Sequence, residues 1–289
     1  MTTERAQFAI LGGSGLYAMP ELTDLTTITP VTPYGKPSDA ITIGTLHGVR
    51  VAFLPRHGRG HVFQPSEIPY RANLYALKAI GVTHVIGVSA CGSLREDYAP
   101  GHVCIPDNLY DNTKDERGRS FFERGIVAHV SVADPFCPDL SRILAEATSE
   151  SGGVAHSGGT FVTIEGPRFS TKAESNLYRQ MGFSIIGMTT SPEAFLAREA
   201  ELCYAVMAHI TDYDVWHEEH VSVEMVMKQF QANITLAQRA VSLAVKKLLV
   251  AARACTCENA LQGSFATSKD RITPELRERL RPIIGKYFA

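Results

Sequence analysis

The sequence lacks any strong excess of charge of either sign. Its 28 lysines and arginines are nearly balanced by 30 aspartates and glutamates, which leaves a formal net charge of −2. Nucleic acids and anionic membrane surfaces are recognised by clustered positive charge. We therefore expect neither of them as a partner.

Long hydrophobic runs are also missing. Residues 1–7 are polar and hold no apolar signal region, and no later apolar run approaches the length of a membrane span. We therefore expect a cytoplasmic protein. The sequence also shows no internal repeat, low-complexity tract or interdomain linker.

Cysteine pairs with the spacing of a zinc site are absent as well. The cysteines are scattered without C-x-x-C pairs, so we expect no metal site. Four of them lie in or beside apolar segments, where free buried thiols are the usual interpretation; these are Cys91, Cys104, Cys137 and Cys203. Cys255-Thr256-Cys257 differs, because two thiols so close in sequence can close a small strained ring, which would be redox-active or, in a thermophile cytosol, part of a set of disulfides. Two unpaired cysteines after a helix are the alternative.

The chain is long and apolar enough for a large core. It has 289 residues, of which 45% are hydrophobic. Predicted strands alternate with predicted helices, as in α/β proteins. We therefore expect one α/β domain over residues 1–289, with a mixed central sheet flanked by helices and a peripheral tail from about residue 255 to the end.

A glycine-rich loop follows the first predicted strand, residues 8–11. Gly12-Gly13-Ser14-Gly15 can turn sharply and expose backbone N–H groups, as phosphate-binding loops do. The dinucleotide pattern G-x-G-x-x-A also fits, but it requires a helix to follow, and Pro20 and Pro30 interrupt the chain there. We predict an anion-binding loop with Ser14 as a hydroxyl donor, and no Rossmann site.

A basic turn follows a predicted hairpin of residues 41–44 and 49–54. The second strand ends in a glycine-rich turn that carries two arginines and two histidines, namely Arg56, His57, Arg59 and His61. Such a density of cations predicts an anion-binding cluster; a solvated basic turn is the alternative. A helix capped by Ser66 is expected to run to about Lys78.

Small residues follow the predicted buried strand 84–89. The run Ser89-Ala90-Cys91-Gly92-Ser93 would let a ligand approach the backbone closely, with tight packing as the alternative. Cys91 has no evident base beside it, so a buried structural thiol is favoured over a nucleophile. The polar segment 107–124 is expected to form a surface loop.

Two further strand ends offer groups for a flat ligand. Strand 159–164 leads to Phe169, which is a candidate for stacking, and to Ser170; a core aromatic is the alternative for Phe169. Strand 184–188 ends with Met188 and Thr189. Ser191-Pro192-Glu193 is a helix-start pattern, so Glu193 is expected to be a helix residue rather than a catalytic one.

Two carboxylates follow the buried strand 203–210. Asp212 and Asp214 stand where ligand crevices form in α/β sheets, and in an extended chain they share one face. An acidic turn capping the next helix is the alternative. That helix is expected over residues 223–254, with an apolar stripe for the core or an interface.

Taken together, these strand ends suit a phosphate and an aminopurine. Hydroxyl and cationic groups can clamp a phosphate; they are Ser14, Arg56, His57, Ser89 and Thr189. Phe169 and Met188 offer apolar surface, and the two aspartates offer acceptors for an exocyclic amine. No metal-ligand set accompanies them, so the phosphate is expected to be free or an ester without magnesium.

Several motifs, in this order, resemble the 5′-methylthioadenosine phosphorylases, which belong to the trimer-forming branch of the purine nucleoside phosphorylases. The motifs are Gly12-Gly13-Ser14-Gly15-Leu16, Arg56-His57-Gly58, Ser89-Ala90-Cys91-Gly92-Ser93-Leu94, Thr163-Ile164-Glu165-Gly166-Pro167-Arg168-Phe169, Met188-Thr189 and Thr211-Asp212-Tyr213-Asp214 with Trp216. The resemblance runs from Phe8 to the long C-terminal helix. It implies a nucleoside phosphorylase fold, a homotrimer or homohexamer, and no cofactor besides inorganic phosphate as co-substrate.

The resemblance also implies a reaction and roles. Phosphate attacks the anomeric carbon of 5′-methylthioadenosine, giving adenine and 5-methylthioribose 1-phosphate. Asp212 is the implied general acid at the purine ring nitrogen, and Asp214 accepts from the exocyclic amine. Phosphate would bind to Ser14, Arg56, His57, Ser89, Ala90 and Thr189, and the nucleoside to Phe169, Ser170, Met188 and Tyr213.

Specificity is implied by the same comparison. Relatives that prefer 6-oxopurines carry asparagine at the position of Asp212. Val223 and Val226 match apolar positions of the 5′-methylthio pocket; His61 and His129 match positions near the 5′ end, with His129 reaching in from a neighbouring subunit. Ordinary surface histidines are the alternative. A broader purine nucleoside phosphorylase and a nucleoside-binding module without turnover are the alternative functions.

Overall fold

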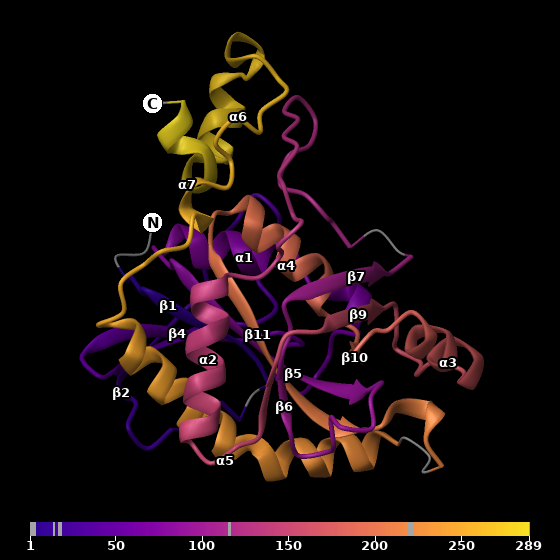
Figure 1. The fold of residues 1–289 in the computed structure, drawn as a ribbon. Helices are drawn as coiled ribbons and strands as arrows, with labels where there is room; N and C mark the ends of the chain where they lie inside the picture. Colours follow the sequence, from indigo (N-terminus) through magenta and orange to yellow (C-terminus); the bar gives the residue numbers. More distant parts are fainter. Residues whose placement is uncertain (1–3, 14, 17–18, 115–116, 219–221, 289) are drawn as a thin grey trace.

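The computed structural model describes residues 4–13, 15, 16, 19–114, 117–218 and 222–288. A mixed sheet runs through the centre of this part of the chain, with helices on both sides (Figure 1). Its main path runs in the order β2-β3-β4-β1-β5-β10-β9-β7. Off this path, β11 pairs with β5 and β6, and β6 pairs with β8. The predicted fold class, a mixed sheet flanked by helices, is confirmed.

The strands are β1 (Phe8–Gly12), β2 (Thr23–Ile28), β3 (Ile41–Leu46), β4 (Val49–Pro55), β5 (His84–Ser93), β6 (Val103–Ile105), β7 (Asn108–Asn112), β8 (Ala155–Ser157), β9 (Thr160–Ile164), β10 (Ile185–Gly187) and β11 (Cys203–Asp212). The α-helices are α1 (Tyr70–Ala79), α2 (Pro138–Glu150), α3 (Lys172–Gln180), α4 (Thr190–Glu199), α5 (Val223–Leu248), α6 (Pro274–Arg279) and α7 (Arg281–Ile284).

Each face of the sheet buries its own hydrophobic core. Alternate residues of a strand point to opposite faces, and β1 shows this clearly. Ala9 and Leu11 belong to the core shared with α1 and α4, which also takes in apolar residues of the tail. Phe8 and Ile10 belong to the core shared with α2 and α5. Among the described residues, no helix is both long and apolar enough to cross a membrane.

Most predicted elements are confirmed to within a few residues. The hairpin is present, since β3 and β4 pair antiparallel. The helix expected over residues 223–254 is α5, which ends earlier, at Leu248. The helix expected from Ser66 is wrong in its start: residues 65–67 form a short 3-10 turn, and α1 begins at Tyr70 without a side-chain cap.

The surface loop expected over residues 107–124 is also wrong. It contains β7, which pairs with β9 at the edge of the sheet, and then Arg117 and Phe121, which are only 4% and 0% exposed. An edge strand whose polar side chains face outward has a composition similar to that of a loop, so its sequence does not indicate a strand. The Thr-rich strand β2, exposed along most of its length, was missed for the same reason.

Candidate active site

The carboxyl ends of four parallel strands meet at one edge of the sheet. β1 pairs in parallel with β4 and β5, and β5 pairs in parallel with β11. Gly12 lies beside Pro55, and Gly92 lies beside Asp212. Open α/β sheets form ligand crevices at such an edge. The predicted phosphate and purine residues of these strands are therefore brought to one place.

Asp212 and Asp214 are both buried there, but not by the extended geometry that the sequence suggested. A bulge at Thr211 shifts the register at the end of β11, and Asp214 has a φ of 53° and begins a 3-10 turn, Asp214–Trp216. The backbone N–H of Asp214 donates to Asp212 Oδ1 at 2.8 Å, and the Thr211 hydroxyl donates to Asp212 Oδ2 at 2.7 Å. A turn, rather than a shared strand face, places both carboxyl groups at the site.

Burial makes both carboxyl groups weaker acids. It raises the pKa of Asp212, and the neighbouring Asp214 carboxylate raises it further, against the hydrogen bonds from Thr211 and from the Asp214 N–H. Burial also raises the pKa of Asp214, against the hydrogen bond from the Ser175 hydroxyl at 2.5 Å. A raised pKa is the direction of shift that a proton-donating carboxyl group requires.

Gly92 of β5 provides the room for these aspartates. A Cβ atom at this position would lie 2.9 Å from Asp212 Oδ1 and 3.1 Å from Asp214 Cβ. The strand beside β11 therefore needs a residue without a side chain here. Cys91 is a buried thiol whose pKa is raised by burial, and it donates to the His209 carbonyl at 3.5 Å. This agrees with the structural interpretation of Cys91.

Arg56 is buried in an ion pair. Its guanidinium donates to both carboxylate oxygens of Glu193, at 2.6 and 2.8 Å, and both side chains are almost fully buried. The remaining N–H groups donate to the Val88 and Leu11 carbonyls and, at 3.3 Å, to Ser89 Oγ. Burial would lower the pKa of Arg56, and Glu193 more than offsets this effect.

The five N–H groups of Arg56 therefore all have partners in the chain, and the longest of these bonds leads to Ser89. Arg56 supplies a fixed positive charge behind Ser89 and holds its hydroxyl. Glu193 lies in α4, as the helix-start pattern predicted. Its pairing with Arg56 was not expected from the sequence.

The other basic residues of this turn divide into buried and exposed ones. Burial lowers the pKa of His57 to about 4, so its imidazole is neutral at neutral pH. Its Nδ1 lies 2.8 Å from the Phe63 carbonyl and must carry the hydrogen, which leaves Nε2 as an acceptor. His61 is exposed and stacks on His57 with ring centres 4.0 Å apart. Arg59 is 60% exposed and faces Asp39. The solvated-turn alternative thus describes Arg59 and His61.

Met188 lies where β9 and β10 end. A Cβ atom on Gly166 would come within 2.6 Å of its sulfur, so the two segments are in close contact. Arg117, whose side chain is fully buried, ties them together by donating to the carbonyls of Met188 and Glu165, both at 2.6 Å. Arg117 was not expected from the sequence because it stands in a polar stretch; the available signal was Glu165, a carboxylate that follows a strand end.

The segment after β9 contains a buried hydroxyl group, that of Ser170. Ser170 is 8% exposed, and its hydroxyl has no hydrogen-bond partner within the described part of the chain. A hollow of about 210 Å³ opens beside it, lined in part by Gly166 and Tyr178. Phe169 is half-buried. Both residues remain candidates for contact with the nucleoside.

Other predicted site residues are placed as follows. Ala90 lies within β5, Thr189 precedes the first residue of α4, and the Tyr213 hydroxyl donates to the Glu96 carbonyl at 3.3 Å. Val223 and Val226 lie in the first turn of α5, where Val223 is 67% exposed. Ser14 lies outside the described residues.

His129 is not brought to this site within one chain. Its backbone N–H donates to the Ser264 carbonyl at 2.8 Å, which places it beside the C-terminal tail. Figure 1 shows that tail, with α6, well apart from the end of β11. Ser175, which holds Asp214, is a further site residue that the sequence did not reveal, because α3 presents it in an ordinary amphipathic helix.

No group of histidine, cysteine and carboxylate side chains close enough to hold a metal ion was found here among the residues that the structure describes; the one group of that kind lies at the other end of β11.

Comparison with known proteins identifies the family. The model of the phosphorylase superfamily matches residues 7–246. The chain is 54% identical over 286 residues to the S-methyl-5′-thioadenosine phosphorylase of Chloroflexus aurantiacus, a match that covers 98% of this chain and 99% of that relative.

Solved structures agree. A methylthioadenosine phosphorylase sourced from an Antarctic soil metagenomic library has a TM-score of 0.93 and 45% identity, covering 97% of this chain and 99% of that one. The methylthioadenosine phosphorylase from Schistosoma mansoni in complex with adenine has a TM-score of 0.85 and 36% identity, covering 91% and 99%.

The chain is a member of the phosphorylase superfamily. This follows from the mixed sheet, the site at the carboxyl ends of its strands and the match to the family model. Within it, the chain belongs to the family of the S-methyl-5′-thioadenosine phosphorylases, which confirms the resemblance seen in the sequence motifs.

Proposed function

We propose that this protein cleaves 5′-methylthioadenosine with inorganic phosphate, giving adenine and 5-methylthioribose 1-phosphate for purine and methionine salvage. The observation that carries the proposal is the buried carboxyl group of Asp212, with its raised pKa, beside the small residues of β5. The relatives named S-methyl-5′-thioadenosine phosphorylases support the choice of substrate.

The chemistry follows from the positions of the two aspartates. A phosphate oxygen forms a bond to C1′ while the bond from C1′ to N9 breaks and its electron pair moves into the purine. Asp212 hydrogen-bonds to or protonates a purine ring nitrogen, which stabilises the departing base. Asp214, held by Ser175, accepts from the exocyclic amine. The raised pKa of Asp212 is in the direction that an acid in this role requires.

The phosphate is bound mainly by neutral donors in front of one buried cation. The hydroxyls of Ser14, Ser89 and Thr189 and the backbone of Ala90 donate to it. His57, being neutral, accepts through Nε2 from a protonated phosphate oxygen. Arg56 supplies positive charge behind Ser89. In this scheme, phosphate is a co-substrate and no cofactor takes part.

The 5′ end of the nucleoside is the part of the proposal that involves a second subunit. Met188 and Phe169 contact the ribose and base, and Val223 and Val226 face the methylthio group. His61 approaches from the same chain, and His129 from a neighbour in a homotrimer or homohexamer. Because His129 lies away from Asp212 within one chain, this role requires an oligomer. We place the enzyme in the cytoplasm.

The proposal is tested by phosphate-dependent base release from methylthioadenosine, adenosine, methylthioinosine and inosine in parallel. Strong preference for methylthioadenosine supports two parts of the proposal: that Asp212 favours a 6-amino base, and that the 5′ pocket is apolar. Comparable rates with adenosine would leave a broader purine nucleoside phosphorylase and remove the methylthio preference. Binding without turnover of any of the four would favour a nucleoside-binding module.

A further inference from the structure

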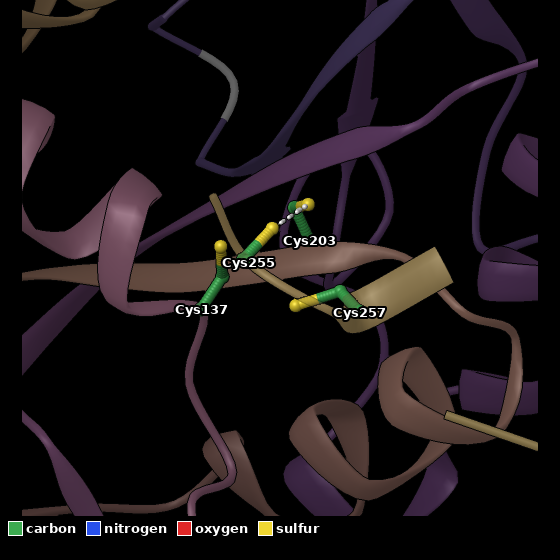
Figure 2. A group of neighbouring side chains, drawn as sticks. All are labelled: Cys137, Cys203, Cys255 and Cys257. Atoms are coloured by element: carbon green, nitrogen blue, oxygen red, sulfur yellow. Dashed lines mark hydrogen bonds between the residues drawn. The ribbon is translucent and has the colours of Figure 1, made fainter. Parts of the chain in front are cut away.

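Four cysteines meet at the end of β11 that lies farthest along the strand from Asp212. Cys203 begins β11, and Cys137 precedes α2. Cys255 and Cys257 come from the tail after α5. Their four sulfur atoms all lie within 4.8 Å of one another, and Figure 2 shows the side chains converging from separate segments. The sequence does not reveal this group, because Cys137 and Cys257 are 120 residues apart.

The spacing of the sulfurs suits a tetrahedral metal ion. Four thiolates bound to zinc at about 2.3 Å stand roughly 3.8 Å from one another. The sulfurs of Cys203 and Cys255 are 3.5 Å apart, and no pair of the four exceeds 4.8 Å. Each sulfur is near the other three, so the group is arranged around a common centre rather than as two separate pairs.

The charges around the sulfurs also fit a metal–thiolate centre. Arg253 Nε donates to Cys255 Sγ at 3.4 Å, and Arg198 Nη1 donates to Cys257 Sγ at 3.6 Å. A divalent ion with four thiolates carries a net charge of about −2, which two guanidinium groups balance. N–H donors to ligand atoms are a regular feature around bound metals. Arg253 also pairs with Glu258 at 2.6 Å, whereas two neutral disulfides would leave Arg198 facing no negative charge at the sulfurs.

The segments that carry the cysteines are held in place by other bonds. Asp139 Oδ2 accepts from the backbone N–H groups of Ala254 and Cys255, at 2.8 and 2.7 Å. The Cys137 N–H donates to the Tyr204 carbonyl at 2.7 Å. Cys137, Cys203 and Cys257 are at most 3% exposed, whereas Cys255 is half-buried. The site is thus preorganised, with one partly open side for entry of an ion.

We propose that Cys137, Cys203, Cys255 and Cys257 bind one structural zinc ion, which fastens the C-terminal tail to β11 and α2. Binding displaces the four thiol protons and closes the site with protein ligands only, leaving no open position for substrate. Since Asp212 lies at the opposite end of β11, the ion stabilises the fold and takes no part in the reaction.

The test is the metal content of the full chain, purified with a reductant and without chelator. Elemental analysis and native mass spectrometry are expected to show about one zinc ion per chain. Cys137→Ser and Cys203→Ser should each lose most of it, whereas Cys104→Ser, a buried cysteine outside the group, should retain it. Replacement of zinc by Co²⁺ in the unmodified chain should give the absorption of tetrahedral cobalt thiolate, a readout that does not depend on the variants folding.

Three results would overturn the proposal. An intact mass lacking two hydrogens per cysteine pair, without bound metal, would show disulfides instead. Four titratable thiols that bind neither Zn²⁺ nor Co²⁺ would show that the group is merely packed. Equal loss of metal in Cys104→Ser and Cys203→Ser would place the ion elsewhere.

Discussion

The backbone N–H of Asp214 donates a hydrogen bond of 2.8 Å to the Oδ1 atom of Asp212. The bond closes the turn after β11 and fixes one carboxyl oxygen of Asp212, while Thr211 engages the other. It also places the two buried carboxyl groups close together, and the Asp214 carboxylate disfavours ionisation of Asp212. The position of the proposed acid is therefore a property of the turn as a whole.

Replacing Asp212 by asparagine keeps the shape of the side chain and removes its proton donor role. We expect kcat for methylthioadenosine to fall by about 10²- to 10⁴-fold, the usual contribution of a general acid. Because an amide can donate to a 6-oxo group, the relative rate with methylthioinosine should rise. Asp97→Asn, at an exposed carboxylate, is the control and should change neither. Unchanged turnover in Asp212→Asn would mean that another group is the acid.

Ser175→Ala tests the positioning of Asp214. The variant removes the hydrogen bond at 2.5 Å from the Ser175 hydroxyl to Asp214 Oδ2, in a buried setting. A hydrogen bond to a charged group contributes about 1.5–3 kcal/mol, so KM for methylthioadenosine should rise by roughly tenfold or more, with little change in KM for phosphate. Ser149→Ala, on the exposed side of α2, is the control. Equal increases in both constants would argue against a role confined to the purine.

The pair of Arg56 and Glu193 separates stability from phosphate binding. Arg56→Leu leaves a buried carboxylate and should lower the free energy of unfolding by about 3–5 kcal/mol. The double variant Arg56→Leu/Glu193→Leu should recover part of this loss in urea unfolding, yet KM for phosphate should stay raised in both. Arg142→Leu breaks an exposed pair with Glu146 and should cost less than about 1 kcal/mol. Recovery of phosphate affinity in the double variant would show that Arg56 acts only on stability.

The buried histidine His209 should make the protein less stable in mild acid. Burial lowers its pKa from 6.5 to about 4, so between these values the unfolded chain binds the proton and the folded chain does not. The contribution of neutral His209 to the free energy of unfolding is therefore fully present above pH 6.5 and is lost as the pH falls toward 4. From pH 7.5 to 5, the wild type should lose about 2 kcal/mol relative to His209→Gln, because one pKa unit corresponds to about 1.4 kcal/mol.

The comparison with His209→Gln is needed because other groups act in the opposite direction. Burial raises the pKa of Glu199 to about 7, so its contribution to stability is present below pH 4.5 and is lost as the pH rises toward 7. A single pH profile of the wild type sums both effects. Urea unfolding of the two proteins at each pH isolates His209, and parallel curves would contradict the assignment.

The sequence predicted the strand ends well, because buried strands and glycine turns leave strong local signals. β5, β11 and the hairpin of β3 and β4 were all expected close to their observed bounds. The edge strands β2 and β7 were not, since their polar side chains face outward and resemble a loop. The side of an element that faces solvent carries little information about its backbone.

Contacts between residues far apart in the chain could not be predicted from the sequence. Arg56 was predicted at the site, but its bidentate pairing with Glu193 depends on the approach of α4 to β4, which no local pattern encodes. The same holds for Ser175 beside Asp214 and for the four clustered cysteines. Strand ends and their residue types can be predicted from short stretches of sequence. The partners that change the pKa of these residues are brought together only by the tertiary fold.

Phosphorolysis is tested by incubating the protein with methylthioadenosine in the presence and absence of phosphate. Adenine and the pentose 1-phosphate are measured in the same samples. We expect adenine to appear only with phosphate and in equal amount to the sugar phosphate. Adenine release without phosphate, with free methylthioribose as the other product, would contradict phosphorolysis and make the protein a hydrolase.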